Sequence, residues 1–423
     1  MTAENKVKLE QNVDYIPPNL DTTLSELYAQ NAIAKIWGIA LPALALPSPP
    51  TRVPDYTTVG TATYEYASYD WWTSGFFPGS LAVLLERAIK YPHCFPSADV
   101  NPTRLELATR YWSDGVHSQA TRVDTHDLGF MIHSAMQPLY DLTGDKRAFG
   151  TLVSAAHALV SRFSDKVGCI RSWDSTVNKR YSFTDASKDY LVIVDNMCNL
   201  NMLYWVAQET GDKRLAEIAT THAETTLKNH LMYPNWAFHH LLVYDAETGV
   251  VKHKLQHQGY EDNSVWSRGQ SWGLLGYAET YGWTRDQKFL DAAINIGEYF
   301  LSRLPEDGVP HWDFDAPRPT VRDTSAAMIA ANGFLVIYEY THERKYLDRA
   351  LYLIRSTITL SLSPKAKFLP DGRVDIGGFD TILMNATINN NEHATRQLAD
   401  TGLVYADYYF LLAGNRLLKL GVF

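Results

Sequence analysis

The chain has 423 residues, a formal net charge of −9 and 46% hydrophobic residues. The acidic balance argues against a nucleic-acid-binding protein, because such proteins need a basic face, so we expect no nucleic-acid partner. The length permits two or three domains, although large folds with a single core are also common at this size. Aromatic residues make up 12% of the chain, which suits either a large core or surfaces that stack on sugars or bases.

The first 50 residues are predicted to form an N-terminal extension that ends in a Pro-rich loop, and residues 51–423 a single domain. The apolar run 33–47 contains Lys35, Pro42 and Pro47. It is too short and too interrupted to span a bilayer, so we expect no membrane partner. The segment before it has no apolar stretch of the kind found in secretory leaders.

The three cysteines, Cys94, Cys169 and Cys198, are sparse and do not have the spacing of metal ligands. An odd, sparse set favours free thiols in a reducing compartment, so we expect a cytoplasmic protein. The sequence shows no zinc spacing, P-loop, dinucleotide fingerprint or nucleophile elbow, and we therefore expect neither a metal nor a cofactor.

A turn motif recurs along the chain, each time between an aromatic-rich apolar run and an amphipathic one. It is written L-T-G-D-K-R (142–147), E-T-G-D-K-R (209–214), W-T-R-D-Q-K (283–288) and Y-T-H-E-R-K (340–345). The runs before the motif, such as 196–207, 272–283 and 325–339, are apolar almost all round, which indicates buried helices. The runs after it have apolar residues at helical spacing on one face only. Each unit therefore pairs an inner buried helix with an outer, half-exposed one.

Two further hairpins are predicted at the ends, one with an inner run at 75–89 and an outer run after Pro102. The other has an inner run at 401–412 and an outer run from Asn415 to the C-terminus. Hairpins of this kind form either an open solenoid or a closed ring. Inner helices this apolar favour closure, so we expect an all-α fold, an (α/α)6 barrel of six helical hairpins. The segment 236–256 alternates in polarity and predicts a small β-hairpin insert.

Two aspartates, Asp127 and Asp195, open inner helices at equivalent positions of neighbouring hairpins. A carboxylate is costly to bury, so a pair in register suggests a site, although Asp is also favoured at helix N-caps. In a ring, the N-termini of all inner helices gather at one end, where their dipoles favour an anionic ligand. Pro138 lies inside the helix that Asp127 opens and predicts a kink there.

The segment 257–273 is the densest in polar and aromatic candidates. It holds Gln258, Trp266, Arg268, Gln270 and Trp272. Arg268 can hold a carboxylate through two parallel hydrogen bonds, and a Trp ring can stack on a sugar face. Together with the acids, these residues predict a site for an acidic sugar, while each of them alone could equally be structural.

These motifs resemble the unsaturated glucuronyl hydrolases of glycoside hydrolase family 88. The resemblance rests on D-W-W-T-S-G-F-F-P-G (70–79), T-H-D-L-G-F (125–130), V-D-N-M-C-N-L (194–200), G-Y-E-D-N-S-V-W-S-R-G-Q-S-W-G (259–273) and D-T-S-A-A-M-I-A-A-N-G (323–333). It implies an (α/α)6 barrel and an enzyme that removes a Δ4,5-unsaturated uronic acid from the non-reducing end of lyase products. It also implies hydration of the C4=C5 vinyl ether rather than ordinary glycosidic displacement.

The resemblance assigns the general acid and base to Asp195 and a supporting, charge-stabilising role to Asp127. It assigns substrate binding to Trp72, His240, Gln258, Trp266, Arg268 and Trp272. Two choices stay open, since Trp71 could replace Trp72 and His239 could replace His240. An unsaturated rhamnogalacturonyl hydrolase, an inverting glycosidase and a non-catalytic helical scaffold remain as alternatives. The preferred substrate and the oligomeric state are also left open.

Overall fold

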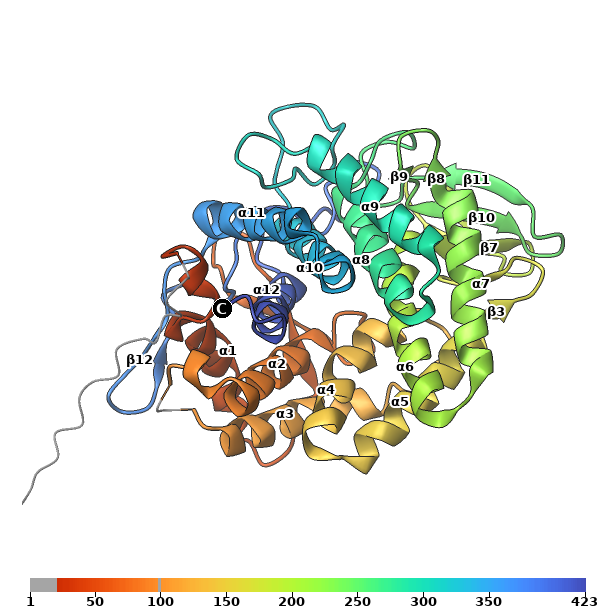
Figure 1. Ribbon diagram of the computed structural model, residues 1–423. Coiled ribbons are helices and arrows are strands. Elements are labelled where there is room, and N and C mark those ends of the chain that lie inside the picture. The colour runs from red at the N-terminus through yellow and green to blue at the C-terminus, as the bar shows by residue number, and fades with distance from the viewer. Residues whose placement is uncertain (1–20, 98–99) are drawn as a thin grey trace, which may run out of the picture.

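The computed structural model describes residues 21–97 and 100–423, which form a two-layered ring of helices (Figure 1). The α-helices are α1 (Gln30–Ala43), α2 (Phe76–Lys90), α3 (Pro102–His117), α4 (Ser134–Thr143), α5 (Lys146–Val160), α6 (Leu200–Thr210), α7 (Lys213–His230), α8 (Ser267–Thr284), α9 (Gln287–Ser302), α10 (Thr324–Thr341), α11 (Arg344–Ser361) and α12 (Val404–Lys419). Short helical segments are η1 (Leu24–Leu27), η2 (Pro92–Cys94), η3 (Gly129–His133, a π-helix) and η4 (Val194–Asn199).

The even-numbered helices line the centre of the ring and the odd-numbered ones cover them (Figure 1). Contacts run from α2 to α4, from η3 to η4, and then through α6, α8, α10 and α12 back to α2, so the inner ring is closed. The inner helices α8 and α10 are buried almost throughout, whereas α9 and α11 bury one face. The architecture is the predicted (α/α)6 barrel.

The recurring turn motif ends one helix and starts the next. Gly144 and Gly211 end the inner helices α4 and α6 in the left-handed conformation, with φ of 69° and 79°. Asp145 and Asp212 then cap the outer helices by accepting hydrogen bonds from backbone N–H groups. One glycine and one aspartate thus stop a helix and start the next, because each satisfies backbone groups that a helix end leaves open.

The sixth hairpin differs from the sequence-based prediction. The segment 404–419 is one continuous inner helix, α12, so the break predicted at Asn415 does not occur. The sixth outer helix is α1, from the first 50 residues, where we expected an extension and a loop. Its Ile33, Ile36 and Trp37 belong to the main hydrophobic core. The ring is therefore closed by the two ends of the described chain.

The predicted β-hairpin insert is present and belongs to a three-stranded antiparallel sheet. Its order is β11 (Val251–Leu255), β10 (Leu241–Asp245) and β7 (Asp189–Ile193). A second hairpin, β1 (Arg52–Thr57) with β2 (Tyr64–Ser68), lies before α2. The remaining strands are two residues long: β3 (Phe163–Ser164), β4 (Cys169–Ile170), β5 (Thr176–Val177), β6 (Ser182–Phe183), β8 (Leu231–Met232), β9 (Ala237–Phe238), β12 (Lys367–Phe368) and β13 (Val374–Asp375).

The kink predicted at Pro138 takes the form of a π-helical turn that lies before the proline, in the helix that follows Asp127. The π-helical turn η3 covers Gly129–His133, and Pro138 lies within α4 behind it. Proline has no N–H to donate, and a wide turn next to it absorbs the change in hydrogen-bond register. Among the described residues, no helix is long and apolar enough to cross a membrane.

Candidate active site

A cavity of about 830 Å³ lies where the inner helices begin. It is lined by residues from β1 and β2, from the segments before α2, η3 and η4, from the start of α8 and from the loop before α12. The lining residues are Arg52, Asp55, Tyr56, Glu65, Tyr66, Asp70, Trp71, Trp72, Arg122, Thr125, His126, Asp127, Trp173, Ile193, Asp195, His240, Gln258, Trp266, Arg268, Ile388, Asn389, Arg396 and Leu398.

The two aspartates are held in register by a close crossing of η3 and η4. A Cβ atom built on Gly129 would lie 2.6 Å from Cα of Asn199, so only glycine fits at this crossing. The Asn199 side chain accepts a hydrogen bond of 3.0 Å from the backbone N–H of Phe130. Neither η3 nor η4 is capped by an aspartate side chain. The N-cap explanation of the pair therefore fails, and both carboxyl groups face the cavity.

Asp195 is placed beside His240 by the three-stranded sheet. Asp195 follows β7, His240 precedes β10, and the backbone N–H of Val194 donates to the carbonyl of His240. His240 Nε2 lies 3.5 Å from Asp195 Oδ1. Burial raises the pKa of Asp195 to about 8, while the Arg268 charge opposes this rise and Asp127 adds to it. Asp195 can therefore carry a proton near neutral pH.

The hydrogen bonds of His240 fix its tautomer. The backbone N–H of Gln258 donates to Nδ1 of His240 over 3.3 Å, so Nδ1 is the acceptor and Nε2 carries the hydrogen. Burial holds the pKa of His240 well below its usual value, and the ring stays neutral. Its Nε2–H lies near Asp195 without forming a hydrogen bond in this structure, and a neutral N–H donor at this position favours the carboxylate that forms when Asp195 has given up its proton. The neighbouring His239 does not line the cavity, so the structure places His240 there.

Arg268 is held by the protein itself and is only 2% exposed. Its Nη1 forms an ion pair of 2.6 Å with Asp323 and also donates to the carbonyl of Thr387, and its Nη2 donates to the carbonyl of Ile388 over 2.7 Å. The sequence predicted a two-pronged contact from this guanidinium to a substrate carboxylate. Because Nη1 is already engaged, Arg268 acts on the cavity chiefly through its charge.

The aromatic candidates divide into cavity walls and support. Trp72 lines the cavity and packs edge-on against Phe130, while Trp71 lies at the rim and is 49% exposed. Trp266 also lines the cavity, with the Arg268 guanidinium 4.7 Å from its ring centre. Trp272 is 1% exposed and does not reach the cavity; it packs behind the wall against Phe130. Seven of the eight predicted site residues thus share one cavity.

Several polar atoms around this cavity are buried without a hydrogen-bond partner in the protein. They are Asp195 Oδ1, Gln258 Oε1, Trp266 Nε1, His126 Nε2 and His240 Nε2. Buried polar groups are normally paired, so a cluster of unpaired ones marks a place where a polar ligand completes the bonding. Gln270, a further candidate from the dense segment, is instead used structurally and donates to the carbonyls of Trp236 and Ile296.

Trp173 and Asp55 are two of the cavity residues that sequence reasoning missed. Trp173 lies among three histidines, with its ring centre 5.1 Å from that of His257. Asp55, on β1, is 6% exposed and accepts a hydrogen bond from Thr73; burial raises its pKa to about 6. Neither residue belongs to the inner-helix repeat; for Asp55 the signal in the sequence was an acidic residue within the strand-like run 52–57.

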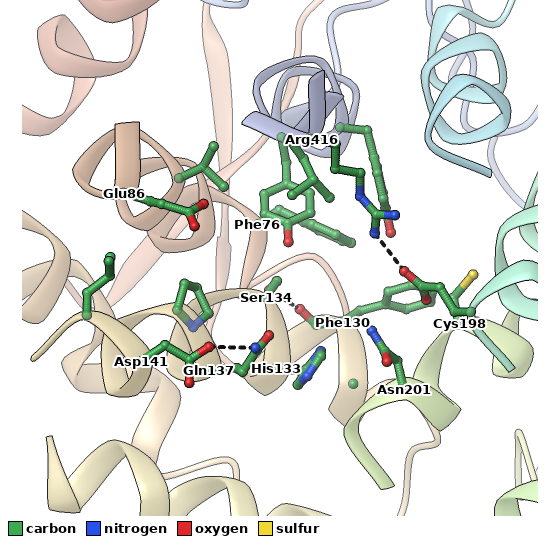
Figure 2. A pocket seen from close by; sticks show the side chains of 18 of the residues that line it. Phe76, Glu86, Phe130, His133, Ser134, Gln137, Asp141, Cys198, Asn201 and Arg416 are labelled. Carbon is green, nitrogen blue, oxygen red and sulfur yellow. Dashed lines mark hydrogen bonds and ion pairs between the residues drawn. The ribbon is translucent and has the colours of Figure 1, made fainter. Parts of the chain in front are cut away.

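A second, smaller cavity of about 180 Å³ lies toward the C-terminal ends of the inner helices, on the other side of the ring from the first (Figure 2). Its wall includes Phe76 and Phe130, whose rings also support Trp72, so an aromatic layer separates the two cavities. The ion pair between Arg416 and Glu279 occupies one side of it. Within residues 21–97 and 100–423, no group of three or more His, Cys, Asp or Glu side chains is arranged to hold a metal ion.

Comparison with known proteins decides the family. The chain is 34% identical to an unsaturated glucuronyl hydrolase of Formosa agariphila over 353 residues, which are 82% of this chain and 79% of the relative. The chain belongs to the unsaturated glucuronyl hydrolase family. It is therefore a glycoside hydrolase that removes an unsaturated uronic acid from oligosaccharides. No model in the collection of family models matches the chain.

Further members of the unsaturated glucuronyl hydrolase family agree with the fold and the length. An unsaturated chondroitin disaccharide hydrolase of Streptococcus pneumoniae is 29% identical and aligns over 86% of this chain and 87% of its own. The crystal structure of an unsaturated glucuronyl hydrolase specific for heparin has a TM-score of 0.78 at 29% identity, covering 96% of this chain and 99% of the other. The corresponding structure from Bacillus sp. GL1 has a TM-score of 0.75 at 25% identity, covering 93% and 97%. The predicted barrel and the predicted family are both confirmed.

Proposed function

We propose that Asp195 is the general acid and base of the reaction. Its protonated carboxyl group delivers the proton to C4 of the C4=C5 double bond, and the resulting carboxylate takes a proton from the water that adds at C5. The hemiketal that forms at C5 opens and releases the remaining sugar as an alcohol. One water molecule is consumed, and Asp195 ends the cycle protonated. The raised pKa of this buried carboxyl group carries the proposal.

The neighbouring side chains support this chemistry in separate ways. We assign to Asp127 the stabilisation of positive charge that develops on the sugar ring during proton transfer. His240 places an N–H donor 3.5 Å from Asp195 Oδ1. The charge of Arg268 attracts the uronate and limits the rise in the pKa of Asp195. Trp72 offers a face for stacking, while Gln258 and Trp266 offer unpaired polar atoms to hydroxyl groups. In this scheme Trp272 acts only by holding the wall in place.

We propose unsaturated disaccharides from glycosaminoglycans as the substrate class. The proposal is supported by relatives named for chondroitin disaccharides and for heparin. Rhamnogalacturonan products are the alternative, and a panel of lyase products separates the two. We further infer that the enzyme works in a reducing compartment, the cytoplasm, since all three cysteines are free and buried. Cell fractionation with an antibody to the chain tests the location.

The decisive experiment follows the ultraviolet absorbance of the conjugated double bond. We expect Asp195→Asn to lower kcat by roughly 10²–10⁴-fold, as expected for loss of a general acid, while substrate still binds. Asp165→Asn, at an exposed carboxylate between β3 and β4, is the matched control and should behave as the wild type. Decay at the wild-type rate in Asp195→Asn would remove Asp195 from the mechanism. Turnover of a saturated uronide would instead indicate an ordinary glycosidase.

A further inference from the structure

Trp71 is the most exposed aromatic side chain in the wall of the active-site cavity. It is 49% exposed, whereas every other aromatic residue of this wall is buried or half-buried. The remaining exposed residues of the wall are charged: Arg52, Glu65, Asp70 and Arg396. Trp71 is therefore the exposed wall residue that offers a large apolar surface at the mouth of the cavity.

Trp72, its neighbour in the chain, lies deeper in the cavity. The Trp72 ring packs against two fully buried rings, with its centre 6.0 Å from that of Phe76 and 5.0 Å from that of Tyr405. Phe76 also belongs to the aromatic layer that separates the two cavities. The two consecutive tryptophans thus serve different depths: Trp72 faces the buried end of the cavity, where Asp195 lies, and Trp71 faces the mouth.

The polar edge of the Trp71 ring is held by a buried carboxyl group. Asp55, on β1, is 6% exposed, and side-chain hydrogen bonding from Thr73 and Trp71 opposes the rise that burial causes in its pKa. The Thr73 hydroxyl donates to Asp55 over 2.9 Å. The indole N–H is the only polar group of a tryptophan side chain, so this contact fixes that edge and leaves the apolar part of the ring accessible to a ligand.

The backbone of the turn that carries Trp71 is also fixed. The Trp71 N–H donates to the carbonyl of Ser68 over 3.0 Å, and the Trp71 carbonyl accepts from the N–H of Ser74 over 3.1 Å. Arg122 donates to the carbonyl of Asp70, directly before Trp71. This bond ties the turn to the segment that leads into η3.

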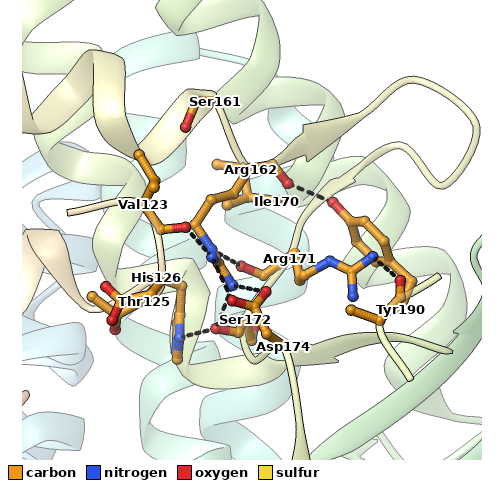
Figure 3. Close-up of polar contacts among 12 residues, drawn as sticks. Val123, Thr125, His126, Ser161, Arg162, Ile170, Arg171, Ser172, Asp174 and Tyr190 are labelled. Carbon is orange, nitrogen blue, oxygen red and sulfur yellow. Dashed lines mark hydrogen bonds and ion pairs between the residues drawn. The ribbon is translucent and has the colours of Figure 1, made fainter. Parts of the chain in front are cut away.

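The segment that holds Arg122 is anchored in turn by Arg162 (Figure 3). Arg162 is 8% exposed and donates to the carbonyl of Val123 and, over 3.3 Å, to the carbonyl of Ser172. An ion pair of 3.0 Å with Asp174 holds the guanidinium in place. Because these contacts order the mouth before a ligand arrives, binding there loses little conformational entropy.

We propose that Trp71 is the stacking platform for the second sugar of the substrate, the one that leaves when the unsaturated uronate is removed. The inference rests on the proposed function, because that function places the unsaturated ring beside Asp195. A saccharide whose non-reducing end reaches this buried carboxyl group must extend its second ring toward the mouth. A pyranose has an apolar face of C–H groups, and an indole ring covers such a face without a charge. Trp71 thereby selects substrates by the sugar next to the uronate.

Two substrates separate this role from a structural one. An unsaturated disaccharide presents a second ring, whereas the methyl glycoside of the same unsaturated uronate presents none. We expect Trp71→Ala to lower kcat/KM for the disaccharide about tenfold, mainly through KM, and to leave the methyl glycoside at its wild-type value. Trp71→Phe keeps a flat apolar ring and should retain most of the activity on the disaccharide. Tyr352→Ala, at a ring on α11 that is 43% exposed, is the matched control and should leave both substrates unchanged.

Two results overturn the proposal. Equal losses on both substrates would place Trp71 at the unsaturated sugar or in the framework of the cavity, and no loss on either would remove it from binding. Failure of the proposed function looks different, because Asp195→Asn then turns over both substrates. Urea unfolding curves establish that the variants are folded. If Trp71→Ala does not fold, the same comparison is made with Trp71→Gln, which keeps a donor for Asp55 but has no ring to stack.

Discussion

The burial of Asp195 should lower the free energy of unfolding as the pH rises from about 4 to about 8. Its pKa is 3.8 in an unfolded chain and about 8 in the folded protein. Between these values the folded state holds a proton that the unfolded state has released, so the free energy of unfolding falls as the pH rises. In Asp195→Asn, an amide of the same shape cannot ionise, and this loss disappears.

The magnitude follows from the size of the shift. Four pKa units correspond to about 5 kcal/mol at most, and we expect on the order of 2–3 kcal/mol because water relaxes around a partly accessible group. Asp195→Asn should therefore match the wild type near pH 4 and exceed it in stability increasingly up to pH 8. Urea unfolding at several pH values measures this difference, with Asp165→Asn as the control. A difference that does not change with pH would refute the reasoning.

Three further outcomes test other parts of the site. Gly129→Ala forces η3 and η4 apart, since the new Cβ would lie 2.6 Å from Asn199. The free energy of unfolding should fall by about 1–3 kcal/mol and kcat should also fall. An unchanged kcat would show that the crossing does not align the two aspartates. Asp323→Asn leaves the buried Arg268 without its counter-charge and should cost about 3–5 kcal/mol in unfolding free energy, measured against wild type in urea. Trp72→Ala should raise KM about tenfold, because it removes a wall of the cavity. Trp272→Ala should leave KM near the wild-type value and lower the free energy of unfolding; equal effects of the two substitutions on KM would contradict their separate roles.

The helical hairpins could be predicted because their signals are local. A glycine in the left-handed conformation and an aspartate cap lie side by side in the turn motif, and the apolar periodicity on either side sets the helices. The carboxylate pair could be found for the same reason, since Asp127 and Asp195 hold equivalent places in two repeats. In a closed ring of hairpins, residues at equivalent positions of two neighbouring repeats lie close together at the same end of the ring.

The sixth outer helix could not be predicted, because its signals depend on distant packing. Gly414 and Asn415 look like a turn, yet both lie inside α12. A Cβ on Gly414 would lie 2.7 Å from Arg87, and the Asn415 side chain bonds to Arg87 and to the carbonyl of Val83. Small and polar residues here serve contacts between helices that are more than 300 residues apart in the chain.

The hydrogen bonds and the ion pair of Arg268 within the protein could not be predicted for a similar reason. Its partners lie 55, 119 and 120 residues further along the chain, at the N-cap of α10 and on the loop before α12. Trp272 shares a motif with two cavity residues but lies one turn further along α8 than Arg268, where it packs against Phe130 instead of reaching the cavity. A shared motif therefore predicted that these residues lie near the cavity, but it did not predict which atoms each of them contacts.

The closure of the ring by its two ends has a consequence for biosynthesis. Arg87 on α2 is fully buried and donates to the carbonyls of Leu27, just before α1, and Leu411, in α12. While the chain is being made, Leu27 is already present when Arg87 emerges, but the two acceptors on α12, Leu411 and Asn415, emerge from the ribosome last. Until α12 has been synthesised and packs against α2, the apolar surface of the first hairpins is exposed to solvent. A chain that stops before residue 404 should accordingly be a client of chaperones and proteases rather than a smaller enzyme.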